Sequence, residues 1–412
     1  MTHTTFKTRD LLPDLVRAFA LIGIVLVNVE LFSRGLSESF LGNEDKTLLD
    51  RGVIATVFGL FTMKSYTLIS MMFGIGLGYQ LQSASLSSGS ALSEEATQTL
   101  FTGRYFRRMT GLLVIGLVHA IFFFLGDILV TYALLGFLLY LMRNMSPKQL
   151  IIGGIGLIIL QVLLLLSMAL FFYVLETLPE GELRTEIMAG MDPQQNGMAA
   201  VDDALRNGGF FGAALGRLTF YPTLLMSLPM VQGIAALGYF LLGLSFYKLG
   251  LIGNLSHRLW RTSRQIFFPL GLVISGASGW IYSGQSDIET GTSLLMLTTN
   301  MLASPLFTFG VIGWLAKLCE SGFGPVLRFI GRGGSASLTA YLFQSLVLSL
   351  VFCGYGLGFF GAFSTLTCVS IALVTGIVSI CVSSLWLKFF KRGPMEILLR
   401  RWTYRGETSA KA

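Results

Sequence analysis

The sequence predicts an all-α fold, a polytopic integral membrane bundle of about ten transmembrane helices. Of the 412 residues, 53% are hydrophobic and only 12% are charged, whereas about 25% of a typical soluble domain is charged. The apolar residues gather in runs of about 20, the length that crosses the hydrocarbon core as a helix. Because backbone groups in lipid must be hydrogen-bonded within their own segment, such runs indicate helices.

Ten apolar runs define the expected spans. They cover residues 11–33, 64–82, 107–125, 127–142, 149–175, 229–249, 265–283, 293–317, 336–353 and 363–387. We expect the first run to remain as a membrane helix, because polar residues interrupt it and no small-residue cleavage site follows. No soluble domain is apparent between the runs, so residues 1–412 are predicted to form a single membrane domain.

The distribution of lysine and arginine predicts the orientation of the bundle, since cytoplasmic loops are enriched in both. One set of alternate connections holds twenty basic residues and the other set holds six. The richer set contains Lys7, Arg9, Arg104, Arg107, Arg108, Arg143, Lys148, Lys248, Arg258, Arg261, Arg264, Lys317, Arg328, Arg332, Lys388, Lys391, Arg392, Arg400, Arg401 and Arg405; the poorer set contains Arg34, Lys46, Arg51, Arg184, Arg206 and Arg217. Strict alternation over ten spans places both chain termini in the cytoplasm.

The net charge of +7 indicates what the protein contacts, and the four cysteines indicate whether it holds disulfides or a metal. Because the excess cations lie in the connections, we expect contact with anionic lipid head groups rather than with nucleic acid. The basic tail KRGPMEILLRRWTY predicts an amphipathic helix along the inner membrane surface. The cysteines lie in or beside apolar runs without paired spacing, so we interpret them as small hydrophobic residues. Neither a disulfide framework nor a metal site is predicted.

The segment from Gly116 to Tyr140 carries two ionisable residues, His119 and Asp127, in otherwise apolar sequence. Gly126 interrupts the run, which predicts a hairpin with His119 near the end of the first helix and Asp127 at the start of the second. Ionisable groups at membrane depth are costly and usually face a cavity, a partner or a substrate path. The structural alternative is that His119 hydrogen-bonds a neighbouring helix while Asp127 caps a helix N-terminus.

The first span carries Asp14, Arg17 and Asn28. Asp14 and Arg17 are three residues apart and share a helix face. Asn28 follows Arg17 by about three turns, so it lies almost above Arg17 at roughly 16 Å along the axis. This polar stripe indicates a lined cavity. The alternatives are that Asp14 and Arg17 neutralise one another, or that Arg17 extends to lipid phosphate.

Further polar residues mark the starts of other spans. Arg107 and Arg108 begin the third span, where they either anchor the topology or hold a phosphate-bearing donor with their planar guanidinium groups. Lys64 opens the second span. Arg332 stands beside glycines before a Ser/Thr-rich helix start, whose free amides together with an arginine are suited to an anion. Gln344 lies within the ninth span and needs a polar partner.

Six stretches carry a family resemblance. They are PDLVRAFALIGIVLVNV, MKSYTLISMMFGIGLG, RRMTGLLVIGLVHAIFFFLGDILVTYALLGF, GYFLLGLSFYKLGLI, SLTAYLFQSL and KRGPMEILLRRWT. In this order they resemble the YeiB-like family of bacterial inner-membrane proteins of unknown function, and residues 230–404 resemble its characteristic C-terminal region. The resemblance implies a multi-pass protein of the bacterial inner membrane. The family is similar to a wider group of transmembrane acyltransferases, which includes sugar O-acetyltransferases and the lysosomal heparan glucosaminide acetyltransferase.

That similarity implies an acyl-CoA donor bound on the inside and an acceptor reached from outside or from the membrane. The residues that match the family's motifs are Asp14, Arg17 and Asn28 in its opening segment, Lys64 as its lysine, and His119 and Asp127 as its third-span histidine and aspartate. In the ninth-span element the family's arginine directly follows a glycine. Here Ser335 follows Gly334, and Arg332 lies three residues earlier.

The resulting hypothesis is a membrane-embedded acyltransferase. His119 would act as general base or transient acyl carrier, Asp127 would orient it or hold the acceptor, and Asn28 would polarise the acyl carbonyl. The donor-site candidates are Asp14, Arg17, Lys64, Arg107, Arg108, Arg332 and Gln344. Acyl-CoA is then the donor substrate, and no metal is expected. The expected partners are membrane lipids and a small-molecule or glycan acceptor, with homo-oligomerisation left open. A transporter or permease for a small solute or lipid, and a structural partner in an envelope complex, remain the alternatives.

Overall fold

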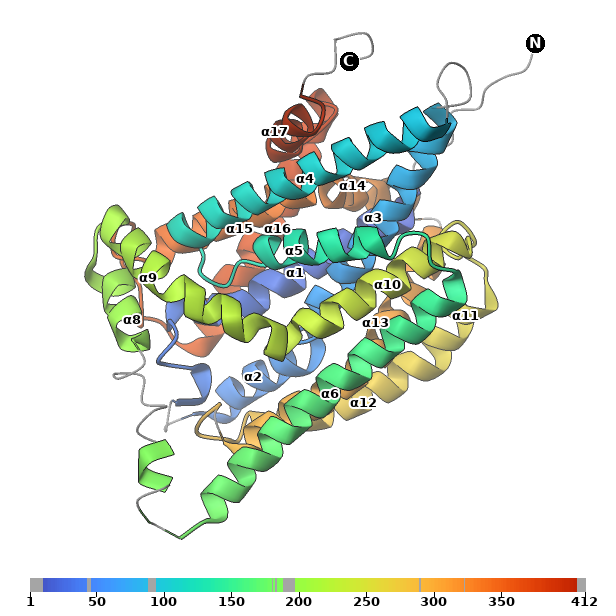
Figure 1. Ribbon diagram of the computed structural model, residues 1–412. Helices are drawn as coiled ribbons and strands as arrows, with labels where there is room; N and C mark the ends of the chain where they lie inside the picture. The colour runs from blue at the N-terminus through green and yellow to red at the C-terminus, as the bar shows by residue number, and fades with distance from the viewer. Residues whose placement is uncertain are drawn as a thin grey trace, which may run out of the picture.

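Every regular element in the described part of the chain is a helix. The computed structural model describes residues 10–42, 46–87, 94–179, 181, 184–187, 197–288, 290–321 and 323–405. In chain order the elements are α1 (Leu11–Ser33), η1 (Phe40–Gly42), α2 (Leu48–Leu60), α3 (Ser65–Ser87), α4 (Glu94–Phe122), α5 (Leu129–Leu141), α6 (Pro147–Thr177), α8 (Met198–Asn207), α9 (Phe210–Leu228), η2 (Pro229–Gly233), α10 (Ile234–Lys248), α11 (Arg258–Thr262), η3 (Ser263–Phe267), α12 (Phe268–Tyr282), α13 (Gly291–Cys319), α14 (Gly324–Ser335), α15 (Ser337–Phe352), α16 (Thr365–Phe389) and α17 (Pro394–Thr403). The long helices form a single bundle around α1 (Figure 1).

The all-helical fold class is confirmed, and the described chain has fewer full-length candidate spans than the ten expected. By length and composition, seven helical segments of the described chain are able to cross a membrane: Leu11–Ser33, Leu48–Ser83, Glu95–Phe122, Pro147–Thr177, Arg258–Tyr282, Gly291–Cys319 and Thr365–Phe389. Two bent pairs raise the number to nine if each pair is one span. One pair, Phe210–Ser227 with Val231–Lys248, bends by 58°, and the other, Gly324–Ser335 with Ser337–Phe352, bends by 75°.

Each of the ten predicted ranges nevertheless contains a helix. The difference lies in length. The range 127–142 corresponds to α5, which has 13 residues and is therefore about 20 Å long, shorter than the hydrocarbon core of about 30 Å. The ranges 229–249 and 336–353 each contain one arm of a bent pair. The number of ten spans and the cytoplasmic location of both termini therefore stay predictions.

Local sequence explains where several helices begin. At the start of α6, Ser146 and Gln149 form a capping box, in which each side chain bonds the other residue's amide, with Pro147 as the first helical residue. Thr47 and Asp50 form the same motif at α2. These pairs satisfy amide groups that the first turn of a helix leaves without an internal partner.

Glycines set the closest helix contacts. At Gly334 a Cβ atom would collide with the backbone oxygen of Asp14, so α1 and α14 touch backbone to backbone. At Gly74 a Cβ atom would collide with the backbone oxygen of Phe240, which brings α3 and α10 equally close. Small residues at helix interfaces allow this approach. The first contact fixes the start of α1 beside the junction of α14 and α15, where the candidate site lies.

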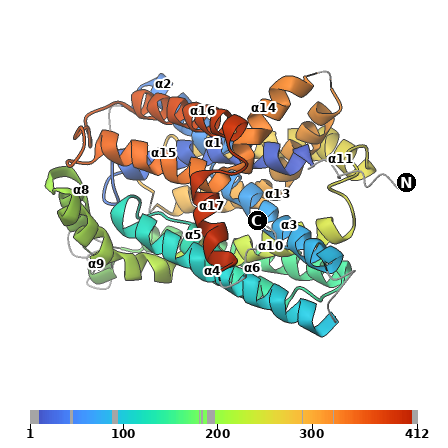
Figure 2. The same ribbon diagram turned by 90° about the horizontal axis from the view of Figure 1, so that it is seen from above.

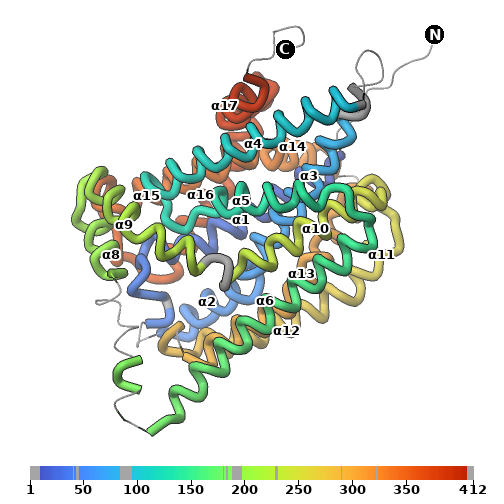
Figure 3. Tube along the Cα trace, viewed as in Figure 1, coloured from blue at the N-terminus to red at the C-terminus, as the bar shows by residue number. Residues whose placement is uncertain are grey.

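Two packing groups make up the bundle. The largest apolar core joins α3, α6, α10 and α13, which are labelled in the right half of Figure 3. A second group surrounds α1, which packs against α3, α13, α14, α15 and α16. The terminal helix α17 lies across one end of the bundle, against α4 and α15 (Figure 2). Helices α4, α5 and α9 complete the side of the bundle that carries the His119 hairpin.

Candidate functional site

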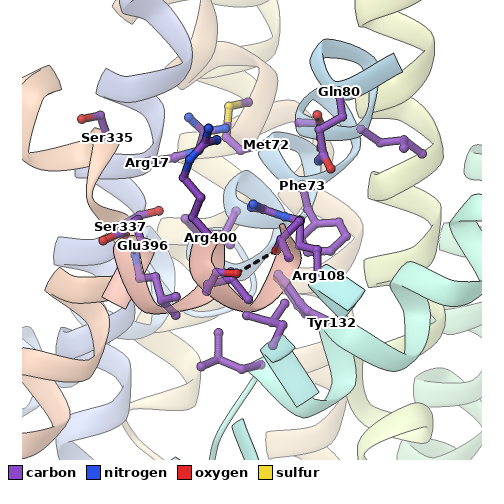
Figure 4. Close-up of a pocket in the computed structure, with 18 of the residues that line it drawn as sticks. Arg17, Met72, Phe73, Gln80, Arg108, Tyr132, Ser335, Ser337, Glu396 and Arg400 are labelled. Atoms are coloured by element: carbon purple, nitrogen blue, oxygen red, sulfur yellow. Dashed lines mark hydrogen bonds between the residues drawn. The ribbon is translucent and has the colours of Figure 1, made fainter. Parts of the chain in front are cut away.

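A cavity of about 450 Å³ opens at the end of the bundle where α1 begins and α17 lies. We call it the arginine cavity, because five arginines from four parts of the chain line it: Arg17, Arg104, Arg108, Arg392 and Arg400. Glu396 is the one carboxylate among its lining residues. Figure 4 shows Arg17, Arg108, Arg400 and Glu396 around this space. The cavity therefore carries a large excess of positive charge.

Two of the predicted donor-site residues belong to this cavity. Arg17 lines it and also pairs with Asp14, with Nη1 2.9 Å from Oδ1, so the contact expected from their spacing is formed. Arg108 projects into it from α4. Its side chain is exposed and lines the cavity. Both guanidinium groups therefore belong to the wall of this space.

Other predicted donor-site residues lie elsewhere. Arg107 does not line the cavity; its Nε donates to the backbone oxygen of Thr403 at 2.8 Å and so ties α4 to the end of α17. Arg104, one turn earlier on α4, lines it instead. Arg332 is exposed near the end of α14 and also lies outside the cavity lining. Of the neighbouring arginines on α4, Arg104 and Arg108 therefore line the arginine cavity and Arg107 does not.

The start of α15, expected to hold an anion, is occupied by a carboxylate of this chain. Glu396 on α17 accepts the backbone amides of Leu338 and Thr339 at 2.9 and 3.2 Å. It also accepts the Thr339 hydroxyl at 2.5 Å. The amide groups are therefore already satisfied, and α17 lies beside the arginine cavity, which its residues Glu396 and Arg400 line.

A second cavity, of about 270 Å³, lies toward the other end of α1. Its lining includes Asn28 from α1, Phe123 and Phe124 from the α4–α5 connection, and Arg217 from α9. Most of the other lining residues are apolar. Ile24 and Ile128 line both cavities, so the two spaces approach one another across the middle of the bundle. Arg17 and Asn28 face different cavities, one at each end of this path.

His119 and Asp127 form a buried pair at this middle level. Their side chains are 2% and 0% exposed, and His119 Nδ1 lies 2.7 Å from Asp127 Oδ1. The other carboxylate oxygen accepts the Val130 amide at 2.9 Å. The hairpin that places them is confirmed, with α4 ending at Phe122 and α5 beginning at Leu129. Because Nδ1 faces a carboxylate, we assign the ring proton to Nδ1, which leaves the lone pair on Nε2.

His119 lies between the two cavities and lines neither. Its ring centroid is 5.0 Å from that of Tyr341, which lines the arginine cavity. It is 6.5 and 6.2 Å from the rings of Phe123 and Phe124, which line the second cavity. The Nε2 atom is buried and has no hydrogen-bond partner among the described residues. Aromatic side chains that line either cavity therefore enclose the one unbonded nitrogen of this imidazole.

Two tyrosines complete this cluster. Asp127 is close enough to Tyr221 and Tyr341 for electrostatic interaction with both hydroxyl groups. In the described part of the chain, the buried hydroxyl groups of Tyr221 and Tyr341 have no hydrogen-bond partner. Neither tyrosine is among the candidates that the sequence indicated. The signal for Tyr341 was its place in the stretch SLTAYLFQSL.

Lys64 and Gln344 lie outside both cavities. Lys64 is fully buried and donates to the side-chain oxygen of Asn300, whose amide group donates to the backbone of Phe58 and Thr62. Gln344 donates to the Ser379 hydroxyl at 2.8 Å, which is the polar partner that the sequence required. Within the described residues, no three His, Cys, Asp or Glu side chains are grouped as metal ligands would be.

Comparison with known proteins gives a family without an assigned activity. Residues 246–406 match a family model described as a protein of unknown function (DUF418). The chain is 27% identical over 419 residues to the uncharacterized protein YxaH of Bacillus subtilis (strain 168), covering 95% of this chain and 93% of that protein. It is 26% identical over 412 residues to the uncharacterized protein YeiB of Escherichia coli (strain K12), covering 96% and 97%. No solved structure matches the chain. Together, the match over residues 246–406 and the two similarities along nearly the whole chain support a YeiB-like family.

Proposed function

We propose that this chain is a membrane-embedded acyltransferase of the bacterial inner membrane. It would move an acyl group from cytosolic acyl-CoA to an extracytoplasmic or membrane-borne acceptor. The observation that carries the proposal is the position of His119 between two cavities that approach each other from opposite ends of α1. A transferase whose donor and acceptor arrive from different sides needs such a pair of spaces, with a proton acceptor at their meeting point.

The arginine cavity is suited to the donor. Coenzyme A carries several phosphate charges, and guanidinium groups bind phosphate through paired hydrogen bonds. Five arginines against one glutamate line the cavity. Its volume of about 450 Å³ falls within the range of small-molecule sites, about 300–1,000 Å³. The phosphates would lie among the arginines, and the pantetheine arm would extend along α1 and α4 toward Ile24 and Tyr341.

The geometry of His119 suits a general base. With the ring proton on Nδ1 and bonded to Asp127, Nε2 is free to take the proton of an acceptor hydroxyl or amine. The acceptor atom then bonds to the thioester carbonyl carbon, the C–S bond breaks, and the CoA thiolate leaves and takes the proton back from the imidazolium. Asp127 stabilises the imidazolium while it exists. Asn28, which lines the second cavity, would polarise the carbonyl from the acceptor side.

Substrates reach Nε2 only if an enclosing ring moves. Tyr341 separates the imidazole from the arginine cavity, and Phe123 and Phe124 separate it from the second cavity. Rotation of these side chains on binding would open the path and, in the closed form, would keep water away from the thioester. Such closure steps are common in enzymes that protect a reactive substrate.

One observation also favours a transporter. Because Ile24 and Ile128 line both cavities, the two spaces resemble the two halves of a substrate path through the bundle. Purified protein in detergent distinguishes the functions: a catalyst consumes acyl-CoA there, whereas a transporter acts only across a sealed bilayer. Titration of CoA into the same preparation tests the donor site directly, and absence of binding would remove the acyltransferase proposal.

A further inference from the structure

A buried cation lines the second cavity. Arg217 lies on α9 and is 2% exposed. Its Nη1 donates to the backbone oxygen of Phe122 at 2.9 Å, and its Nη2 contacts the sulfur of Cys353 at 3.4 Å. The ring of Tyr355 lies 5.9 Å from the guanidinium carbon. Among the described residues, no carboxylate lies within ion-pair distance of this guanidinium.

These neighbours do not neutralise Arg217. Burial raises the pKa of the Tyr355 hydroxyl, so this group stays uncharged at neutral pH. Phe122 is the last residue of α4, and its carbonyl belongs to the negative end of that helix, which carries about half an elementary charge. That contact has a structural purpose, but it offsets only part of a full positive charge. A buried charge without a counter-ion is costly, so the cavity is suited to an anion.

The surroundings of Arg217 indicate a ligand from the membrane. The second cavity is lined mainly by apolar side chains of α1, of the α2–α3 connection and of α9, including Leu31, Phe61 and Leu224. The opposite face of α9 exposes large apolar side chains: Phe211 at 78%, Leu215 at 63% and Met226 at 81%. Helix α9 therefore presents an apolar face to the outside and a cation to the cavity. A ligand that matches this site has an anionic group and an apolar body.

We propose that the second cavity binds the phosphate group of an amphiphile, with Arg217 as its counter-ion and the apolar residues of α1 and of the α2–α3 connection against its body. Tyr221 follows Arg217 by one turn of α9, about 6 Å along the axis, and interacts with Asp127. A hydroxyl or amine next to the bound phosphate would thus point toward the His119 pair. This last step rests on the proposed acyltransferase function, in which the amphiphile is the acceptor; the binding site itself does not.

Lipid binding tests this site without any turnover measurement. The probes are fluorescent phosphatidic acid and the diacylglycerol with the same chains, which differ only in the phosphate, titrated into purified protein in detergent. We expect saturable binding of phosphatidic acid and binding of diacylglycerol weaker by about tenfold or more, as loss of a charge-assisted hydrogen bond predicts. Equal affinity for both lipids would overturn the proposal. Because the assay measures binding alone, it remains interpretable if the protein transfers no acyl group.

Two substitutions test separately whether lipid binding needs the charge of Arg217 and whether it needs the volume of the second cavity. Arg217→Gln should weaken phosphatidic acid binding about tenfold, whereas the matched control Arg206→Gln should not, since Arg206 is half-exposed and paired with Glu38. If Arg217→Gln does not fold, Val27→Trp keeps Arg217 and adds bulk to the cavity wall on α1, and it should also abolish saturable binding. Unchanged affinity in either folded variant would overturn the proposal.

Inorganic phosphate distinguishes the source of the anion. Millimolar inorganic phosphate is added to the bound lipid. If it displaces phosphatidic acid from the wild-type protein but has no effect on Arg217→Gln, the site also takes free phosphate. Phosphatidic acid binding that persists under these conditions would identify a site that requires the apolar body. Both results keep the phosphate at Arg217. Displacement that is equal in the wild type and in Arg217→Gln would contradict it.

Discussion

His119 Nδ1 lies 2.7 Å from Asp127 Oδ1, and the second oxygen of the same carboxylate accepts the Val130 amide at 2.9 Å. One side chain thus caps the start of α5 and fixes the imidazole. The structural and functional interpretations that the sequence left open are both compatible with this geometry. The structural one does not account for Nε2, which is buried and unbonded among rings that line the two cavities.

Replacement of His119 tests the catalytic role. His119→Gln keeps a polar side chain, so the protein should fold and bind CoA, but transfer should fall by about 10²–10⁴-fold because the base is lost. Asp127→Asn should show a similar or smaller loss, since the amide oxygen still accepts a hydrogen bond. The measurement is acyl-CoA consumption by purified variants together with their thermal stability. A His119→Gln protein with full turnover would end the catalytic hypothesis.

Arg107 and Arg108 form a matched pair for the donor site. Arg108 lines the arginine cavity, whereas Arg107 bonds the end of α17 outside it. Arg108→Lys should weaken CoA binding about tenfold, because lysine lacks the planar fork that grips phosphate. Arg107→Lys should leave the affinity unchanged. Calorimetric titration of CoA measures both, and equal effects would show that the cavity does not distinguish the two residues.

Glu396 tests the contact between α17 and α15. Glu396→Gln leaves one acceptor oxygen in place of two and removes the negative charge at the start of α15, so the protein should lose about 1 kcal/mol of stability. The apparent Tm of the detergent-solubilised protein should fall. Glu38→Gln is the control, because Glu38 forms only an exposed pair with Arg206, and such pairs contribute little. Equal Tm values for the two variants would argue against the cap.

The close contact of α1 with α14 is tested at Gly334. Alanine there would collide with the Asp14 backbone, and backbone adjustment in a packed core costs about 1–3 kcal/mol. Gly276→Ala on α12 is the control, since a Cβ at that position has no neighbour within 4 Å. Thermal unfolding should show a lower Tm for Gly334→Ala only. Because this contact positions Arg17, the same variant should also bind CoA more weakly.

Topology is tested by reporter fusions at Ala200 and Arg405. Strict alternation of ten spans predicts that Ala200 lies outside and Arg405 inside the membrane, since the basic connections are cytoplasmic. A phosphatase reporter should be active at the first position and a fluorescent protein at the second. The same side for both positions would contradict the proposed topology.

The sequence by itself determined the fold class and the hairpin. Apolar runs of membrane length permit only helices, because lipid offers the backbone no hydrogen-bond partner. The bounds of α1 agree with the first predicted range. His119 and Asp127 were recognisable because they are ionisable residues in apolar sequence, and their contact follows from eight residues of local chain that a tight turn closes.

Only the tertiary structure decided which other residues line the two cavities. Arg107 and Arg108 are neighbours in sequence, yet helix geometry points them about 100° apart, and the packing of α4 against α17 selects Arg108 for the cavity. Arg217 was counted as a loop cation, and its burial depends on α9 packing against α4, about a hundred residues earlier in the chain. Glu396 meets α15 over 57 and 58 residues of separation. The bent pairs and the short α5 have the same origin: composition determines that a segment is a helix, but its neighbours determine where it bends and which of its faces lines a cavity.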